Sequence, residues 1–232
     1  MNAVASNRFG LARLRWPHVG LGVLGLILIA ALAFVTFRPI LVLPLIVEAP
    51  RYGLTDQQGK WLLDTDLRGQ IVLYNFTYAG CAAPCPQTSQ AMRAVQDRLG
   101  ELSAQGIAVA LVTISFDPAR DTPAALRAYA AQQGADPSRW HFATGEPAEL
   151  KEVIGRGFRT FYTPNPDGTY RFDPVFVLVD GDGIIRAEYR TAAPNIDNIL
   201  RDVRLVDEEA RNSSGAGRLA YEAAHLFVCY PR

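Results

Sequence analysis

Two cysteines, Cys81 and Cys85, lie four residues apart in the run CAAPCP. A pair at this spacing can close into a disulfide or bind one soft metal ion with both sulfurs. Prolines at positions 84 and 86 flank the second cysteine, and proline is tolerated in the first turn of a helix because its missing N–H has no partner to lose there. We therefore predict that Cys85 begins a helix, whose partial positive charge favours a thiolate. The alternative is two buried structural cysteines that do not react.

A buried strand and a helix are expected to position this pair. Residues 71–76 read IVLYNF, which is apolar with one interruption and typical of a strand buried on both faces. Residues 87–99 repeat apolar or small residues at helical spacing, at Ala91, Met92, Val95 and Leu99. The two cysteines therefore lie where a buried strand turns into a helix.

The rest of this region alternates between strand and helix patterns. We predict a hairpin over 52–67, a strand over 107–116, a helix over 123–133 capped by Thr122, a strand over 140–144, a helix over 147–155, a polar hairpin or loop over 160–171, strands over 175–179 and 184–189, and a helix over 196–206. This order is that of an α/β, thioredoxin-like fold.

The N-terminal region has the pattern of a transmembrane helix. Residues 19–37 carry no charge, and a membrane helix needs about 20 such residues. Three arginines precede this run and one follows it, which places the N-terminus in the cytoplasm and the rest of the chain on the extracytoplasmic, periplasmic side. A cleaved signal peptide is the alternative, although its apolar core runs only about 7–15 residues. The acid-free start also suits a mitochondrial presequence, so the mitochondrial inner membrane stays open.

These patterns divide the chain into five parts. They are a cytoplasmic segment 1–18, a transmembrane anchor 19–37, a linker 38–50, a thioredoxin-like domain 51–206, and a linker with a C-terminal tail 207–232. After residue 47 the chain has 23 acidic and 19 basic residues, a net charge of −4. We therefore expect membrane lipid as a partner of residues 19–37 and no nucleic-acid partner.

The cysteine run and a second motif together resemble the Sco/SenC proteins. The run YNFTYAGCAAPCPQTSQAM is followed by SFDPARDTP at residues 115–123 and by RWHFATG at 139–145. The resemblance implies a membrane-anchored, thioredoxin-like protein that helps to build the dinuclear copper site of cytochrome c oxidase. It also implies copper bound through the two motif cysteines and a distant histidine, while some members act as thiol-disulfide reductants.

By position, Cys81 and Cys85 match the family's cysteines, which implies that they are its metal ligands and its redox-active disulfide. Asp117 begins the DPARDTP run and matches the start of the family's second motif. That motif either supports the site or is ordinary helix-capping architecture, because acidic loops commonly precede helices.

The third copper ligand departs from the family pattern. The family's histidine would fall near Phe172 or Asp173, and neither position is a histidine. His18 lies on the predicted cytoplasmic side, and His141 lies inside a predicted strand, where we expect a packed or partly solvated side chain. The sequence therefore leaves the third ligand open.

Pro174, directly before the strand 175–179, resembles the proline, often cis, that faces the cysteines in thioredoxin and TlpA-like proteins. It is equally compatible with an edge-strand proline. In the tail, His225 and Cys229 are four apart in a helix-compatible stretch, a spacing that suits a soft-metal pair. We therefore hypothesise that His225 replaces the missing ligand, the alternative being an apolar terminal helix.

Two functions follow from these residues. The first is copper handling by the CxxxC motif, which the resemblance places in assembly of the cytochrome c oxidase copper site, with the copper-site subunit of the oxidase as the implied partner. The second is thiol-disulfide exchange without copper, which would make the protein an oxidoreductase rather than a copper chaperone. A peroxide-reducing enzyme is a weaker third, because the sequence has no dedicated peroxidatic motif.

Overall fold

The computed structural model describes residues 16–37, 40–82, 85–103, 105–215 and 217–227. The chain divides into two units, residues 1–39 and 40–232, which are described separately. In the first unit, α1 spans Trp16–Phe37. Within the described ranges, no helix has both the length and the hydropathy required of a bilayer span. The anchor at residues 19–37 therefore stays a prediction, and residues 1–15 of the N-terminal segment lie outside the described part.

The second unit alternates strands and helices. Its strands are β1 (Val47–Glu48), β2 (Gly53–Asp56), β3 (Trp61–Leu63), β4 (Ile71–Thr77), β5 (Val109–Ser115), β6 (Trp140–Thr144), β7 (Tyr162–Pro164), β8 (Tyr170–Phe172), β9 (Phe176–Val179) and β10 (Ile184–Tyr189). Its helices are α2 (Cys85–Ser103), α3 (Pro123–Gln133), α4 (Pro147–Leu150), α5 (Ile196–Asn212) and α6 (Gly217–Phe227), with a 3-10 turn at Asp64–Leu67 and a π-helical turn at Lys151–Gly157.

One mixed sheet, in the order β1-β10-β9-β4-β5-β6-β2-β3, carries the domain. The neighbours β4, β5 and β6 are parallel, because α2 and α3 provide the crossovers between them. The strand β9 pairs antiparallel with β4, so that Val179 lies opposite Val72 and Phe176 lies opposite Asn75. The strands β7 and β8 form a separate hairpin.

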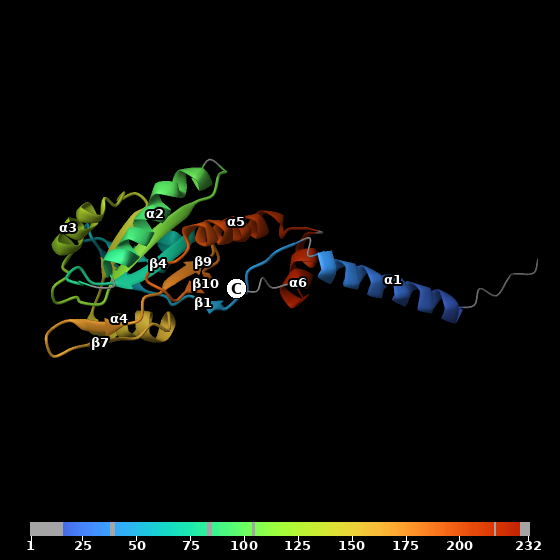
Figure 1. Ribbon diagram of the computed structural model, residues 1–232, viewed down its shortest axis with the longest axis horizontal. Helices are drawn as coiled ribbons and strands as arrows, with labels where there is room; N and C mark the ends of the chain where they lie inside the picture. The colour runs from blue at the N-terminus through green and yellow to red at the C-terminus, as the bar shows by residue number, and fades with distance from the viewer. Residues whose placement is uncertain (1–15, 38–39, 83–84, 104, 216, 228–232) are drawn as a thin grey trace, which may run out of the picture. The chain divides into compact units, whose positions relative to one another are not determined.

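The central strand β4 is buried along its whole length, as its apolar sequence predicts. Ile71 and Leu73 point into a core formed with α2, α3 and α5. Val72, Tyr74 and Phe76 point into a second core beneath α4 and the turn that follows it. This alternation arises because successive side chains of a strand point to opposite faces. Figure 1 shows the resulting layers, with α2 and α5 on one side of the sheet and α4 on the other.

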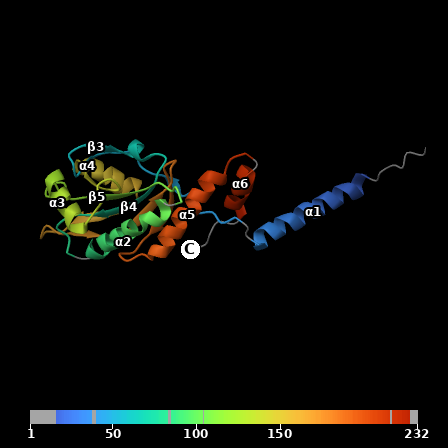
Figure 2. The ribbon, with the colours of Figure 1, turned by 90° about the horizontal axis from the view of Figure 1, so that it is seen from above.

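The predicted elements mostly agree with the structure. The helix over 123–133 is confirmed with its cap, since the Thr122 hydroxyl accepts a hydrogen bond from the N–H of Ala125. The predicted linker beginning at residue 207 is wrong for residues 207–212, which continue α5. The polar side chains in this segment make contacts that a linker would lack. Arg211 pairs with Asp207 one helical turn away and donates to the carbonyl of Gln105. Figure 2 shows α3 and α6 at opposite ends of this unit, as Figure 1 does.

Candidate functional site

The cysteine pair lies where β4 turns into α2. The N–H of Cys81 donates to the carbonyl of Tyr78 at 3.2 Å, which closes a tight turn after the strand. Cys85 is the first residue of α2, as the flanking prolines predict. The structure brings the two cysteines together as a disulfide whose Cα atoms are 5.7 Å apart. The pair can therefore exist as a disulfide and, once reduced, as two thiols on one short loop.

The two sulfurs differ in accessibility. Cys85 is buried, with 1% of its surface exposed, whereas Cys81 is only partly buried. A partner can therefore reach Cys81 first, and Cys85 is suited to resolve an intermediate formed on it. Cys85 lies at the N-terminus of α2, where unpaired N–H groups carry a partial positive charge.

The second sequence motif holds the turn that carries Cys81. The buried carboxylate of Asp121 accepts a hydrogen bond from the N–H of Ala79 at 2.8 Å and another from the hydroxyl of Ser115. The parallel register of β4 and β5 places Thr77 beside Ser115, so the loops that follow the two strands meet at one edge of the sheet. Burial raises the pKa of Asp121 above its usual value. The sequence alone left open whether Asp121, in the DPARDTP motif, supports the site or belongs only to the helix cap.

Asp117 holds a different segment, the β7–β8 hairpin. Its buried carboxylate accepts from the guanidinium of Arg120 and, at 3.3 Å, from the hydroxyl of Tyr170. Arg120 also donates to the carbonyl of Gly168, at the turn of the hairpin. Burial and then the nearby Asp117 raise the pKa of the Tyr170 phenol. The DPARDTP motif thus connects the cysteine turn to the hairpin.

Aromatic side chains pack where the family's histidine is expected. Phe172 faces Tyr162 across the hairpin, and its ring lies 5.0 Å from that of Phe116 and 6.4 Å from that of Tyr78. Cys81 packs against the same core. These aromatic residues were missed by reasoning from the sequence, although the alternation of Tyr170 and Phe172 in a short strand signals one packed face.

No metal-binding cluster is visible in the part of the chain that the structure describes. There, no group of three or more His, Cys, Asp or Glu side chains could hold a metal ion. His141 lies partly buried on β6, where burial lowers its pKa. Pro174 lies half-buried between β8 and β9, and its proposed approach to the cysteines stays a prediction.

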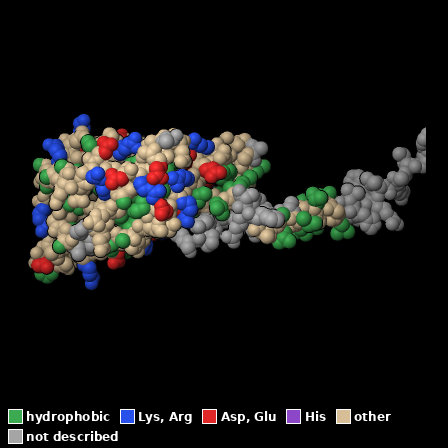
Figure 3. Space-filling view, turned by 45° about the horizontal axis from the view of Figure 1, so that its top comes forward, with side chains coloured by type: hydrophobic (Ala, Val, Ile, Leu, Met, Phe, Trp, Pro, Cys, Tyr) green, Lys and Arg blue, Asp and Glu red, His purple; other side chains and the backbone are tan. Residues whose placement is uncertain are grey.

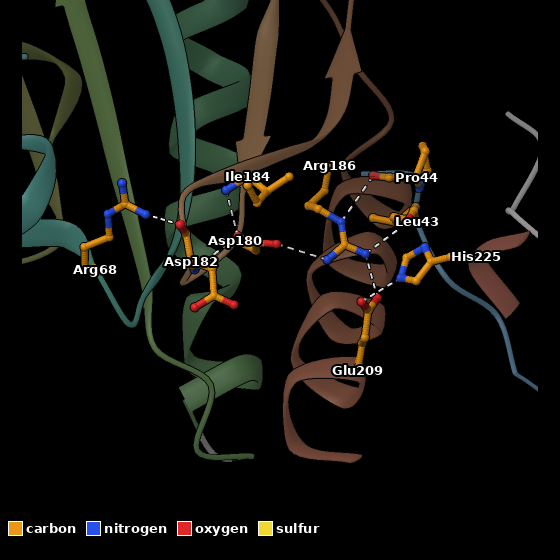
Figure 4. A network of polar contacts seen from close by, with 9 residues as sticks. All are labelled: Leu43, Pro44, Arg68, Asp180, Asp182, Ile184, Arg186, Glu209 and His225. Carbon is orange, nitrogen blue, oxygen red and sulfur yellow. Dashed lines mark hydrogen bonds and ion pairs between the residues drawn. The ribbon is translucent and has the colours of Figure 1, made fainter. Parts of the chain in front are cut away.

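His225 lies against a buried charged network rather than beside the cysteines. Its Nε2 atom is 2.8 Å from Glu209, which also pairs with Arg186 at 2.6 Å (Figure 4). Arg186 pairs in turn with Asp180 at the end of β9. Because β9 is antiparallel to β4, Asp180 lies at the start of β4, whereas Cys81 follows its end, about 20 Å away along the strand. The structure thus does not bring His225 to the cysteines, and Cys229 lies outside the described residues.

Residues 46–206 match the family model described as SCO1/SenC. The chain belongs to the SCO1/SenC family. The SCO1 protein homolog of Bacillus subtilis (strain 168) is 27% identical over 164 residues, which cover 69% of this chain and 83% of the relative.

Solved SCO1/SenC structures share the fold. BsSco, a member of the Sco family of cytochrome c oxidase assembly proteins in which a disulfide switch has been identified, is 28% identical with a TM-score of 0.62, over 71% of this chain and 96% of that one. Arabidopsis thaliana ScoI with copper bound is 25% identical with a TM-score of 0.61, over 69% of this chain and 98% of that one.

The SCO1/SenC match contains the cysteine turn, the second motif and the aromatic hairpin. It ends at residue 206, before the last part of α5 and before α6. Glu209 and His225 therefore belong to a part of this chain outside the family match.

Proposed function

We propose that this protein assists assembly of the copper site of cytochrome c oxidase through Cys81 and Cys85. The observation that carries the proposal is the contact between these two cysteines at the start of α2, in a chain of the SCO1/SenC family. Two of its relatives support it, since BsSco belongs to a family of oxidase assembly proteins and Arabidopsis ScoI binds copper. The client is then the copper-site subunit of the oxidase.

The donor set of the turn suits copper in its reduced state. Two thiolates are soft ligands that favour Cu(I), and the short loop between Cys81 and Cys85 lets both sulfurs face one ion. The disulfide must first accept two electrons and two protons, and the resulting thiols lose protons when they bind the metal. Copper is cargo in this scheme, held by the two sulfurs and released to the client.

Thiol-disulfide exchange is the second candidate, and one observation favours it. Among the described residues no third metal ligand accompanies the cysteines, and Phe172 packs near the position where the family's histidine is expected. In this reaction the Cys81 thiolate attacks a client disulfide, forms a mixed disulfide and releases one client thiolate. Cys85 then attacks Cys81, which closes the internal disulfide and releases the second client thiol. Two electrons thus pass from this protein to its client.

We further propose that residues 19–37 anchor the protein in a membrane, with the domain on the extracytoplasmic side. The support is the uncharged run of 19 residues with arginines before it, together with a cysteine pair that suits an oxidising compartment. A bacterial membrane and the mitochondrial inner membrane are both compatible with these features.

One pair of measurements on the full-length protein in detergent tests the two chemistries. The reduced protein is titrated with Cu(I) against a coloured chelator, and the Cys81–Cys85 potential is measured in glutathione buffers. Equimolar Cu(I) that is lost in Cys81→Ser and kept in Cys229→Ser supports copper handling. A disulfide that cycles without any Cu(I) binding supports exchange alone, and a pair that does neither refutes both functions.

A further inference from the structure

The helix α6 has two different faces and lies outside the SCO1/SenC match. Tyr221 and Ala224 are buried on one face, with 8% and 0% of their surface exposed. Leu219 and Leu226 are seven residues apart and therefore lie on one side of the helix, where 72% and 78% of their surface is exposed. A short helix thus packs on the domain through one face and presents leucines on the other.

A buried network fixes this helix to the segment that leads into the domain. The guanidinium of Arg186, only 3% exposed, donates to the carbonyls of Leu43 and Pro44 at 2.8 and 3.2 Å. It also pairs with Glu209, which contacts His225 of α6 (Figure 4). Arg186 contacts residues 43–44 directly and α6 through Glu209, so α6 and residues 43–44 are held at the same end of the domain.

That end carries most of the domain's exposed large hydrophobic side chains. Of the eight found among the described residues of 40–227, five lie here: Leu41, Leu45, Val47, Leu219 and Leu226. Figure 3 shows hydrophobic side chains gathered at the end of the domain where α6 lies. Clusters of this kind on a protein surface mark contact with a partner or a membrane.

We propose that these five side chains rest on the surface of the lipid bilayer in which residues 19–37 are anchored, an inference that depends on the proposed anchor. Only five residues lie between Phe37 and Leu43, and such a connection spans at most about 20 Å. The end of the domain that carries the leucines is thereby kept close to lipid headgroups.

The same geometry orients the cysteines. The Arg186 network lies at the start of β4, and the disulfide follows the end of β4. When the end of the domain with the Arg186 network contacts the membrane, the disulfide therefore points away from the membrane. Cys81 is then presented about 20 Å further from the bilayer, toward the extramembrane part of a client.

Spin labels on the full-length protein test this contact. Leu219→Cys and Leu226→Cys are made separately with Cys229→Ser and labelled without reductant, which leaves the Cys81–Cys85 disulfide closed. Each protein is reconstituted in phosphatidylcholine–phosphatidylglycerol vesicles, and the collision rates of the label with oxygen and with a water-soluble nickel complex are compared. Leu63→Cys, on the exposed side of β3, is the matched aqueous control, and Leu26→Cys in α1 reports the anchor.

We expect a higher ratio of oxygen to nickel collisions at positions 219 and 226 than at 63. If position 26 is in lipid while 219 and 226 resemble 63, the proposed surface contact is refuted and the anchor stands. Labels at 219 and 226 shielded from both reagents would mean a protein contact, such as a second copy, and would also refute it. An aqueous label at position 26 refutes the anchor and this inference together.

Discussion

The N–H of Ala79 donates a hydrogen bond of 2.8 Å to the buried carboxylate of Asp121. This contact joins the turn that presents Cys81 to a residue 42 positions further along the chain. The Ser115 hydroxyl, at the end of β5, donates to the same carboxylate. Asp121 therefore accepts hydrogen bonds both from β5 and from the cysteine turn. The position of Cys81 therefore depends on the second motif.

Replacing Asp121 by alanine is expected to destabilise the domain. Asp121→Ala leaves the N–H of Ala79 and the hydroxyl of Ser115 without their acceptor, and an unsatisfied buried group costs about 1–3 kcal/mol. Denaturant unfolding monitored by tryptophan fluorescence measures the loss. Asp97→Ala, which removes an exposed carboxylate paired with Arg93, is the control and should change stability by less than about 0.5 kcal/mol. Equal losses in the two variants would contradict the role given to Asp121.

The pH dependence of stability provides a separate test of Asp121. Burial raises its pKa in the folded protein above the usual 3.8, so the folded state holds the proton more tightly than the unfolded chain. The protonated carboxyl therefore contributes stability that is fully present below pH 3.8 and is lost as the pH rises through the folded pKa. In Asp121→Asn this loss is absent. The free energy of unfolding of the variant, relative to wild type, should rise between acid and neutral pH, and a pH-independent difference would contradict the raised pKa.

Restoring a histidine near the family's position should strengthen copper binding. Phe172 packs with Phe116 against the core that Cys81 also contacts, and the family's histidine is expected near this position, so Phe172→His supplies an imidazole on the same core. We expect Cu(I) affinity, measured by chelator competition, to rise by roughly tenfold, equivalent to about 1.4 kcal/mol. The control is Phe161→His. Phe161 is exposed and directly precedes Tyr162, which lies opposite Phe172 in the hairpin, so this variant should leave the Cu(I) affinity unchanged. No gain in Phe172→His would show that residue 172 does not reach the metal.

Arg186 is expected to be critical for the end of the domain opposite the cysteines. Arg186→Met removes the buried cation that pairs with Asp180 and Glu209, whose side chains are only 11% and 13% exposed, and removing one partner of a buried ion pair costs about 3–5 kcal/mol. The loss is measured as a lower free energy of unfolding. Arg190→Met removes a half-exposed arginine of the same strand region and should cost about 1 kcal/mol or less. A similarly small loss of stability in both variants would mean that water solvates Asp180 and Glu209 when Arg186 is removed.

Several features of this chain follow from local sequence alone. The apolar run at 71–76 predicts a strand buried on both faces, because its side chains all leave water only when each face packs against a core. The prolines beside Cys85 predict a helix start, and Thr122 before Pro123 predicts a capped helix, because both depend on neighbours within one turn. The CxxxC motif with DPARDTP also indicates the family.

Other features depend on contacts between distant segments, which no local pattern specifies. The meeting of Asp121 with Ala79 follows from the parallel register of β4 and β5, and the continuation of α5 past residue 206 accompanies the pairing of Glu209 with Arg186. The position of His225 was open in the sequence because it depends on where the tail packs. The antiparallel pairing of β9 with β4 decides it, since this pairing places Asp180 and its network at the end of the sheet away from Cys81.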